Sequence, residues 1–191
     1  MTEKEIAHIK VKLKWIWEVL SKKIELGDYA TSLGFRYYPT KHYIKLGEFF
    51  DGLTYLYWFE ENFLNDSYNP NFLFEWTIIL YKTGNIREAE KKAFVTFCSN
   101  IYLFDKFFQR LVVPIETDEN SNLASSYDFQ YSSDQSELAD FTNWLNEYTS
   151  TEKFITLSTK FIELNTRLET ERDEETRGYL LLCSQQLVSK I

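Results

Sequence analysis

The chain has 191 residues, 44% of them hydrophobic and 18% aromatic, which is enough apolar material for a core and excludes a wholly disordered chain. Its six Gly and three Pro are too few for a β-sandwich or β-barrel with many tight turns, so the composition favours long helices with short connections. The net charge of −8 is unevenly distributed: residues 1–114 carry 15 Lys/Arg against 14 Asp/Glu, and residues 115–191 carry 6 Lys/Arg against 15 Asp/Glu. The acidic second part argues against nucleic acid as a ligand, because it repels phosphate groups.

The clearest helical pattern covers residues 3–26. Apolar side chains recur there at spacings of three and four residues, which places them on one helix face: Ile6, Ile9, Leu13, Ile16, Leu20 and Ile24. Thr2 and Glu5 have the spacing of a capping box, and Gly27 marks the end of the helix. A short helix is expected over residues 28–34.

Residues 40–64 predict a second long helix from the spacing of their apolar side chains. Gly47 and Gly52 lie within it, and each costs roughly 1 kcal/mol relative to Ala in a helix interior. The two glycines therefore indicate either close contacts between helices or a break into two shorter ones. Residues 65–69 are expected to form a turn, with Pro70 at the first position of the next helix.

A helix–turn–helix hairpin is predicted over residues 70–98. Its apolar positions lie on both sides of the turn: Phe72, Trp76, Ile79, Leu80, Ala89, Ala93 and Phe97. Gly84 allows the turn to close, and Asn85 with Glu88 three residues later indicates the cap of the second helix. The small side chain of Ala89 lets two helices approach each other.

The segment 76–93 resembles a tetratricopeptide repeat, a helical hairpin that stacks on its neighbours. The match extends over residues 70–98 and implies a diverged, repeat-like array. In that family the first helix of each hairpin lines a concave groove for a peptide or another protein. Carried onto this sequence, the partner-binding face consists of Asn71, Phe74, Ile78, Tyr81 and Lys82. The alternative is that these side chains fill the interfaces between helices.

After the hairpin, the apolar pattern predicts a helix from residue 100 to Pro114. Residues 116–136 are rich in Ser, Asp and Asn and predict a long irregular loop. Three further helices are expected over residues 134–148, 151–168 and 173–189. The whole chain is thus predicted to be all-α, with seven to nine antiparallel helices in one domain over residues 1–191. A subdivision into residues 1–114, 115–133 and 134–191 is open.

Motifs for catalysis or metal binding are missing from the sequence. His8 and His42 are the only histidines, and no local signature supports a Cys98–His42 pair, so a buried thiol is the favoured interpretation. The segment from Asp118 resembles the start of a calcium loop but has Leu, not Gly, at its sixth position. We predict no catalytic residue, no cofactor and no metal.

The start of the chain has no basic stretch followed by an apolar run, and nowhere do about 18 apolar residues follow one another. We therefore expect a cytoplasmic protein that does not enter a membrane. The first helix carries a basic and aromatic combination that suits a membrane surface: Lys10, Lys12, Lys14, Trp15 and Trp17. Packing against the next helix, with the lysines in water, is the favoured interpretation.

These patterns predict a non-enzymatic protein- or peptide-binding module of helical-repeat type. The alternative is an all-helical enzyme or small-molecule-binding protein whose site combines Tyr57, Glu60 and Arg110 with residues 116–136. A second alternative is an acidic inhibitor or immunity-type protein, or a self-assembling one, motivated by the acidic residues 115–191. A homo-oligomer is left open.

Overall fold

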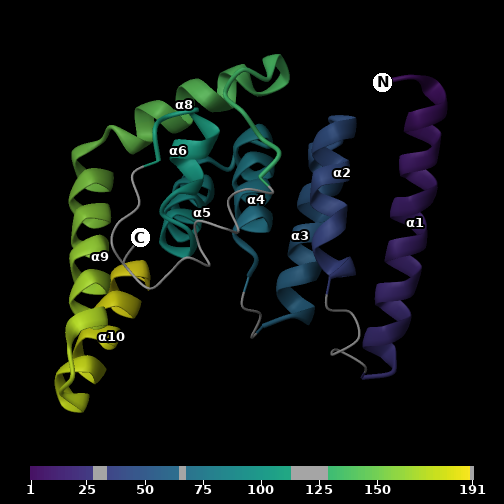
Figure 1. Ribbon diagram of the computed structural model, residues 1–191. Helices are drawn as coiled ribbons and strands as arrows, with labels where there is room; N and C mark the ends of the chain where they lie inside the picture. The colour runs from purple at the N-terminus through teal and green to yellow at the C-terminus, as the bar shows by residue number, and fades with distance from the viewer. Residues whose placement is uncertain (28–33, 65–67, 113–128, 190–191) are drawn as a thin grey trace. The chain divides into compact units, whose positions relative to one another are not determined.

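The computed structural model describes residues 1–27, 34–64, 68–112 and 129–189. Within these residues all regular secondary structure is helical, with nine α-helices, two 3-10 helices and no strand, which confirms the all-α prediction (Figure 1). The α-helices are α1 (Glu3–Glu25), α2 (Tyr38–Leu46), α3 (Phe49–Asn62), α4 (Pro70–Lys82), α5 (Ile86–Ser99), α6 (Leu103–Phe107), α8 (Ala139–Thr149), α9 (Glu152–Thr170) and α10 (Glu174–Ser189). The 3-10 helices are η2 (Phe35–Tyr37) and η3 (Ser136–Leu138). The short helix expected over 28–34 falls almost wholly outside the described residues.

The chain divides into two compact units, residues 1–89 and 90–191. The boundary lies within α5, so this helix belongs to both. Each unit has its own core, and each is described separately below.

Helix α1 begins and ends where the sequence indicates. The Thr2 hydroxyl accepts a hydrogen bond from the Glu5 N–H at 3.3 Å, and the Thr2 N–H donates to the Glu5 carboxylate at 2.7 Å, completing the capping box. At the other end Gly27 has a φ of +70° and its N–H donates to the Ile24 carbonyl. The buried face of α1 consists of four residues of the predicted stripe: Ile9, Leu13, Ile16 and Leu20.

Gly47 divides the helix predicted over residues 40–64 into α2 and α3. Its φ is +72°, a left-handed conformation that side-chain-bearing residues rarely adopt. The Gly47 N–H donates to the Ile44 carbonyl, and the Glu48 N–H donates to the Tyr43 carbonyl, each at 3.0 Å. This pair of bonds is the Schellman arrangement that ends a helix.

Gly52, in contrast, lies inside α3 and marks a close contact between helices. A Cβ atom at this position would lie 3.0 Å from Cδ1 of Ile79 in α4 and 3.1 Å from Cβ of Tyr43 in α2. The absence of a side chain therefore lets α2, α3 and α4 meet, and these three helices contact one another pairwise. Both interpretations of the glycines hold, one at each position.

The connection between α4 and α5 has the predicted turn. Asn69 caps α4 by accepting from the Asn71 N–H at 2.8 Å, and Pro70 occupies the first turn. Gly84 has a φ of +80°; its N–H donates to the Tyr81 carbonyl, and the next N–H donates to the Leu80 carbonyl. The same Schellman arrangement thus ends α4, and three residues separate α4 from α5.

The second unit contains a shorter helix than predicted. The helix expected from residue 100 to 114 is limited to α6, Leu103–Phe107. The Phe107 carbonyl accepts a hydrogen bond from the Ser133 N–H at 2.8 Å, so it is satisfied from outside the helix, and Gln109 turns the chain with a φ of +54°. The Gln109 N–H donates to the Lys106 carbonyl at 3.1 Å and the Arg110 N–H donates to the Asp105 carbonyl at 2.8 Å, so the Schellman arrangement ends α6 as well, here without a glycine that would mark it in the sequence.

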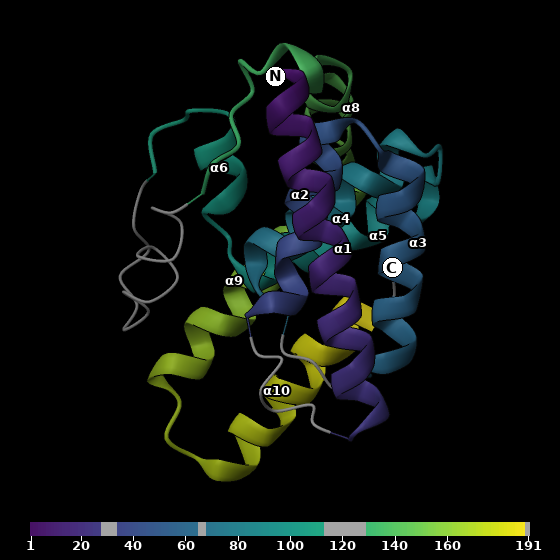
Figure 2. The same ribbon diagram turned by 90° about the vertical axis from the view of Figure 1, so that its right-hand side faces the viewer.

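The remaining helices agree with the predicted segments. Thr151 caps α9 by accepting from the Phe154 N–H at 3.2 Å. Helices α9 and α10 lie side by side in both views (Figure 2) and pack through Leu164, Leu168 and Leu180, with Cys183 at the edge of this cluster. Of the loop predicted over residues 116–136, only residues 129–136 are described; residues 129–135 are irregular, and Ser136 begins η3.

Candidate functional site

The partner-binding face predicted on α4 is largely inside the fold. Phe74 and Ile78, its two central side chains, have 0% of their surface exposed. Asn71, Tyr81 and Lys82 are half-buried, and the Lys82 ammonium lies 5.7 Å from the centre of the Phe49 ring. For Phe74 and Ile78 the alternative interpretation holds, because these side chains fill the core. They do not line an open groove.

Most of the aromatic side chains that the structure describes pack against one another in the two cores. In the first unit, Phe59 lies at the centre of such a group, 4.8 Å from the Phe72 ring and 4.9 Å from the Phe63 ring. In the second unit, Phe154 lies 5.4 Å from Phe97 and 5.2 Å from Tyr148. The Phe154 pairs are edge to face, a geometry that stabilises a core beyond simple burial. The high aromatic content therefore serves mainly the interior.

One group of rings in the first unit remains exposed. Trp15, Phe35 and Tyr38 expose 48%, 45% and 40% of their surfaces. The Phe35 ring lies 5.7 Å from the Trp15 ring, edge to face, and 6.3 Å from the Tyr38 ring. Two lysines lie over Tyr38: the Lys41 ammonium at 4.3 Å from the ring centre and the Lys12 ammonium at 5.5 Å. We call these five residues the aromatic–lysine surface.

Two helices position this surface. Lys12 and Trp15 are three residues apart on α1, next to the buried stripe, and Tyr38 and Lys41 are three residues apart on α2. Side chains at this spacing lie on the same side of a helix. Phe35, in η2, lies between them, and α1 contacts both η2 and α2.

Buried hydrogen bonds hold the elements beneath the surface in place. The Trp17 indole N–H donates to the Tyr43 hydroxyl at 2.8 Å, which ties α1 to α2. The Tyr55 hydroxyl donates to the Arg36 carbonyl, which ties η2 to α3. The Arg36 guanidinium is itself buried and lies 5.2 Å from the centre of the Phe63 ring. The exposed rings are thus mounted on a fixed backbone.

The charges around the surface are not balanced. Lys10 forms an ion pair with Glu48 at 2.6 Å, and Lys14 lies 4.0 Å from Glu18. Among the residues that the structure describes, Lys12, Lys41 and Lys45 form no ion pair.

His42 lies within this positive field. Burial lowers the pKa of its imidazole to about 4, and the neighbouring Lys12, Lys41 and Lys45 contribute to the lowering. Its Nε2 atom is buried without a hydrogen-bond partner in the described part of the chain. At neutral pH the ring is uncharged, so the positive charge of this region comes from the lysines.

The sequence did not predict this surface. Lys12 and Trp15 belong to a basic and aromatic combination for which packing against the next helix is favoured, and Phe35, Tyr38 and Lys41 are not part of it. A signal was present, because residues 35–46 contain three basic side chains, four aromatic ones and no Asp or Glu. That stretch combines rings with cations, which can interact with one another, and has no carboxylate to compensate the charge.

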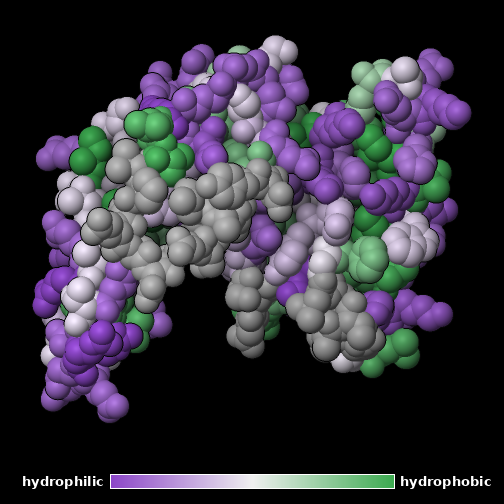
Figure 3. Space-filling model, viewed as in Figure 1, coloured by the Kyte–Doolittle hydropathy of each residue, from purple (hydrophilic) through white to green (hydrophobic). Residues whose placement is uncertain are grey.

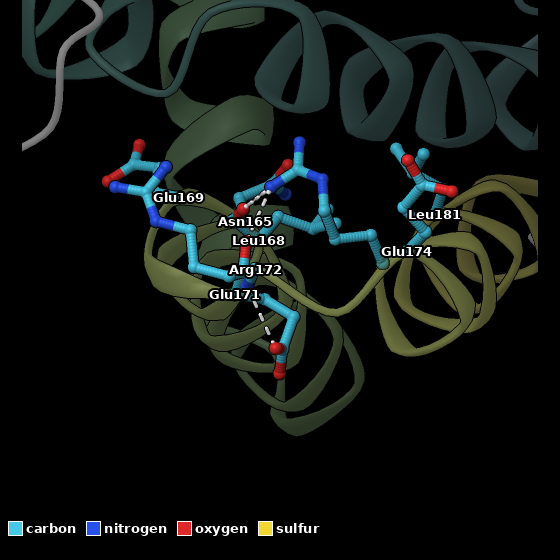
Figure 4. Close-up of a pocket in the computed structure, with 8 residues that line it drawn as sticks. Asn165, Leu168, Glu169, Glu171, Arg172, Glu174 and Leu181 are labelled. Atoms are coloured by element: carbon cyan, nitrogen blue, oxygen red, sulfur yellow. Dashed lines mark hydrogen bonds between the residues drawn. The ribbon is translucent and has the colours of Figure 1, made fainter.

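A hollow of about 650 Å³ lies between α9 and α10 in the second unit (Figure 4). Arg177 extends across it and donates through Nη1 to the Leu168 carbonyl and, at 3.1 Å, to the Glu171 carbonyl. The Glu171 carboxylate accepts from the Arg172 N–H at 2.9 Å. These groups satisfy the end of α9 and the turn that follows. Their role is to join the two helices.

The residues weighed for catalysis are dispersed. Burial raises the pKa of the Cys98 thiol to about 12, so this thiol is not a nucleophile near neutral pH. Tyr57 and Glu60 are exposed on α3 in the first unit. Arg110, in the second unit, donates to the Asn146 side chain at 3.1 Å and lies 4.4 Å from the centre of the Phe108 ring.

The described residues contain no group of three or more His, Cys, Asp or Glu side chains arranged to hold a metal ion. None of their helices combines the length and the apolar character needed to cross a bilayer.

Comparisons of the chain with protein-family models, with curated proteins and with solved structures find no match. The resemblance to tetratricopeptide repeats thus stays a prediction.

Proposed function

We propose that this chain is a non-enzymatic module that binds a protein or peptide through the aromatic–lysine surface. The observation that carries the proposal is the contact between the three exposed rings of Trp15, Phe35 and Tyr38. Isolated exposed apolar side chains are normal on proteins, and both units carry them. In Figure 3 such hydrophobic residues appear among the hydrophilic ones on the face of the first unit. A contiguous group of exposed rings, in contrast, consists of the residue types that are enriched in interaction sites.

A partner that covers these rings gains binding free energy from the apolar surface that it removes from water. Burying a large apolar side chain that was exposed contributes about 1.5–3 kcal/mol. Each ring here is about half exposed, so covering all three supplies a few kcal/mol before the cost of association is subtracted. Trp and Tyr are also the residue types at which truncation most often weakens an interface strongly.

The rigid support of the surface favours binding as well. Rings mounted on α1, η2 and α2, with buried hydrogen bonds beneath them, lose little conformational freedom when a partner arrives. A site of this kind needs no catalytic group.

The test is a binding experiment with peptides selected from a displayed random library against the full chain. Trp15→Ala and Tyr38→Ala are compared with wild type by fluorescence anisotropy of the selected peptides. We expect each substitution to weaken binding at least about tenfold, which corresponds to roughly 1.4 kcal/mol. Circular dichroism checks that the variants remain helical.

Tyr57→Ala is the matched control. Tyr57 is an exposed tyrosine in the same unit, on α3, and makes no ring contact among the described residues. Its substitution should leave binding unchanged. Equal loss in the Tyr57 variant, or unaltered binding in the Trp15 and Tyr38 variants, would place the site elsewhere and refute the proposal.

A further inference from the structure

We infer that the partner of the aromatic–lysine surface is an acidic peptide segment that carries an apolar anchor residue between its carboxylates. This inference rests on the proposed function and names the chemistry of its partner. It follows from the charges next to the rings, from the positions of the lysines and from the limited exposure of the rings.

The lysines around the surface differ in whether they are paired. Lys10 already has a partner within the chain, because it forms an ion pair with Glu48. Lys12, Lys41 and Lys45 form no ion pair with the residues that the structure describes. Lys12 and Lys41 both lie over the Tyr38 ring, so their ammonium groups converge on one region. A partner that covers this region must supply negative charge, because a basic or neutral one leaves the lysines uncompensated.

The cations lie directly beside the exposed rings. The Lys12 and Lys41 ammonium groups both lie within 6 Å of the Tyr38 ring centre, at 5.5 and 4.3 Å, so the cations are next to the apolar surface and not remote from it. An apolar side chain that contacts Trp15 and Phe35 therefore places the neighbouring residues of its own chain beside these lysines. Carboxylates at those neighbouring positions pair with the cations while the anchor covers the rings.

The aromatic–lysine surface fits a peptide better than an anionic membrane surface. A membrane-binding helix inserts its apolar side chains into the headgroup region and has a strongly basic polar face. Trp15, Phe35 and Tyr38 are about half covered by the protein itself. The same helix α1 carries four glutamates beside its six lysines, so its polar face is only weakly basic. These features favour a narrow partner that contacts only the ring and lysine positions.

The experiment uses two synthetic, dye-labelled probes and the full chain. One probe has a Leu-Phe core flanked on both sides by glutamates, and the other has glutamine at every glutamate position. We expect the glutamate probe to bind about tenfold more tightly than the glutamine probe, and its affinity to fall as salt is raised. Affinity for the glutamine probe should not depend on salt.

Charge reversal locates the effect. Lys12→Glu/Lys41→Glu should weaken binding of the glutamate probe about tenfold or more, because two attractive pairs become repulsive. The control Lys153→Glu/Lys160→Glu changes the net charge equally at two exposed positions on α9, and should alter affinity by less than about twofold. The salt dependence of the wild-type chain gives an independent measurement that needs no variant.

The outcomes distinguish the inference from the proposed function. If both probes bind equally and both depend on Trp15 and Tyr38, the site is correct and its acidic partner is wrong. If neither these probes nor any library-selected peptide depends on the rings, the proposed function fails and the inference fails with it. If vesicles of phosphatidylserine and phosphatidylcholine bind the chain through Lys12 and Lys41 while the glutamate probe does not, the surface is a membrane site and the inference is overturned.

Discussion

Replacing Gly52 by Ala tests whether the meeting of α2, α3 and α4 is as tight as the structure shows. In an open helix interior this change is favourable by about 1 kcal/mol, because Ala has the higher helix propensity. Here the added Cβ would lie 3.0 Å from Cδ1 of Ile79 and 3.1 Å from Cβ of Tyr43. The Ile79 methyl can move slightly, but the Tyr43 Cβ is attached directly to the α2 backbone.

Overpacking of this kind costs about 1–3 kcal/mol, which exceeds the gain in propensity. We expect Gly52→Ala to lower the free energy of unfolding by roughly 1 kcal/mol and Tm by about 2–4 °C. Denaturation followed by tryptophan fluorescence measures this, because four of the five tryptophans lie in the first unit. Removing Cδ1 with Ile79→Val should recover part of the loss, so the double variant should be more stable than the sum of the single effects indicates.

Gly178→Ala is the matched control for this substitution. Gly178 also lies inside a helix, α10, but a Cβ there meets no atom within 4 Å. The change should therefore stabilise the second unit by about 0.5–1 kcal/mol, as propensity alone predicts. If Gly52→Ala is as stabilising as Gly178→Ala, the three helices do not meet closely and the packing derived for the first unit is incorrect.

Three further measurements address buried groups. Thr40→Val removes a hydroxyl that donates to the Glu75 carboxylate in the core, and should destabilise the chain by about 1.5–3 kcal/mol in chemical denaturation; an unchanged midpoint would show that this bond is unimportant. The pKa of His42 is about 4, below its ordinary value of 6.5, so the folded chain binds the imidazole proton less readily than the unfolded chain does. The contribution of the neutral His42 to the free energy of unfolding is therefore complete above pH 6.5 and is lost as the pH falls towards 4. Proton NMR should give a midpoint near 4 for its ring, and a midpoint near 6.5 would contradict the burial. Cys98, with a pKa raised to about 12, should react far more slowly with a thiol reagent at neutral pH than the free thiol of a small molecule does, and comparable rates would show that α5 opens readily.

The structure also assigns different roles to side chains of the same type. Phe72 and Phe59 pack against each other in the first core with their ring planes tilted by 44°, whereas Phe35 is half exposed beside Trp15. Lys10 is paired and Lys12 is not, although they are two residues apart. Binding is therefore expected to depend on a few positions, and substitution of the other rings should act through stability.

Helix positions were predictable from sequence because their causes are local. The spacing of apolar residues, the capping box of Thr2 and Glu5, and the left-handed glycine Gly84 each act within a few residues. Such signals identified α1, α4, α5, α9 and α10 closely. They failed at α6, because the left-handed residue that ends this helix is Gln109, and a glutamine gives no such signal in the sequence.

The location of the candidate site depended on tertiary structure for a related reason. The spacing that placed Phe74 and Ile78 on one side of α4 is the same whether that side faces solvent or the core, and it faces the core. Lys12 is available and Lys10 is not because Glu48, on a different helix, pairs with only one of them. The sequence alone determined that the chain is helical and rich in rings. Only the packing of α1 against η2 and α2 decided which rings and which cations remain on the surface, because exposure depends on neighbours that are distant along the chain.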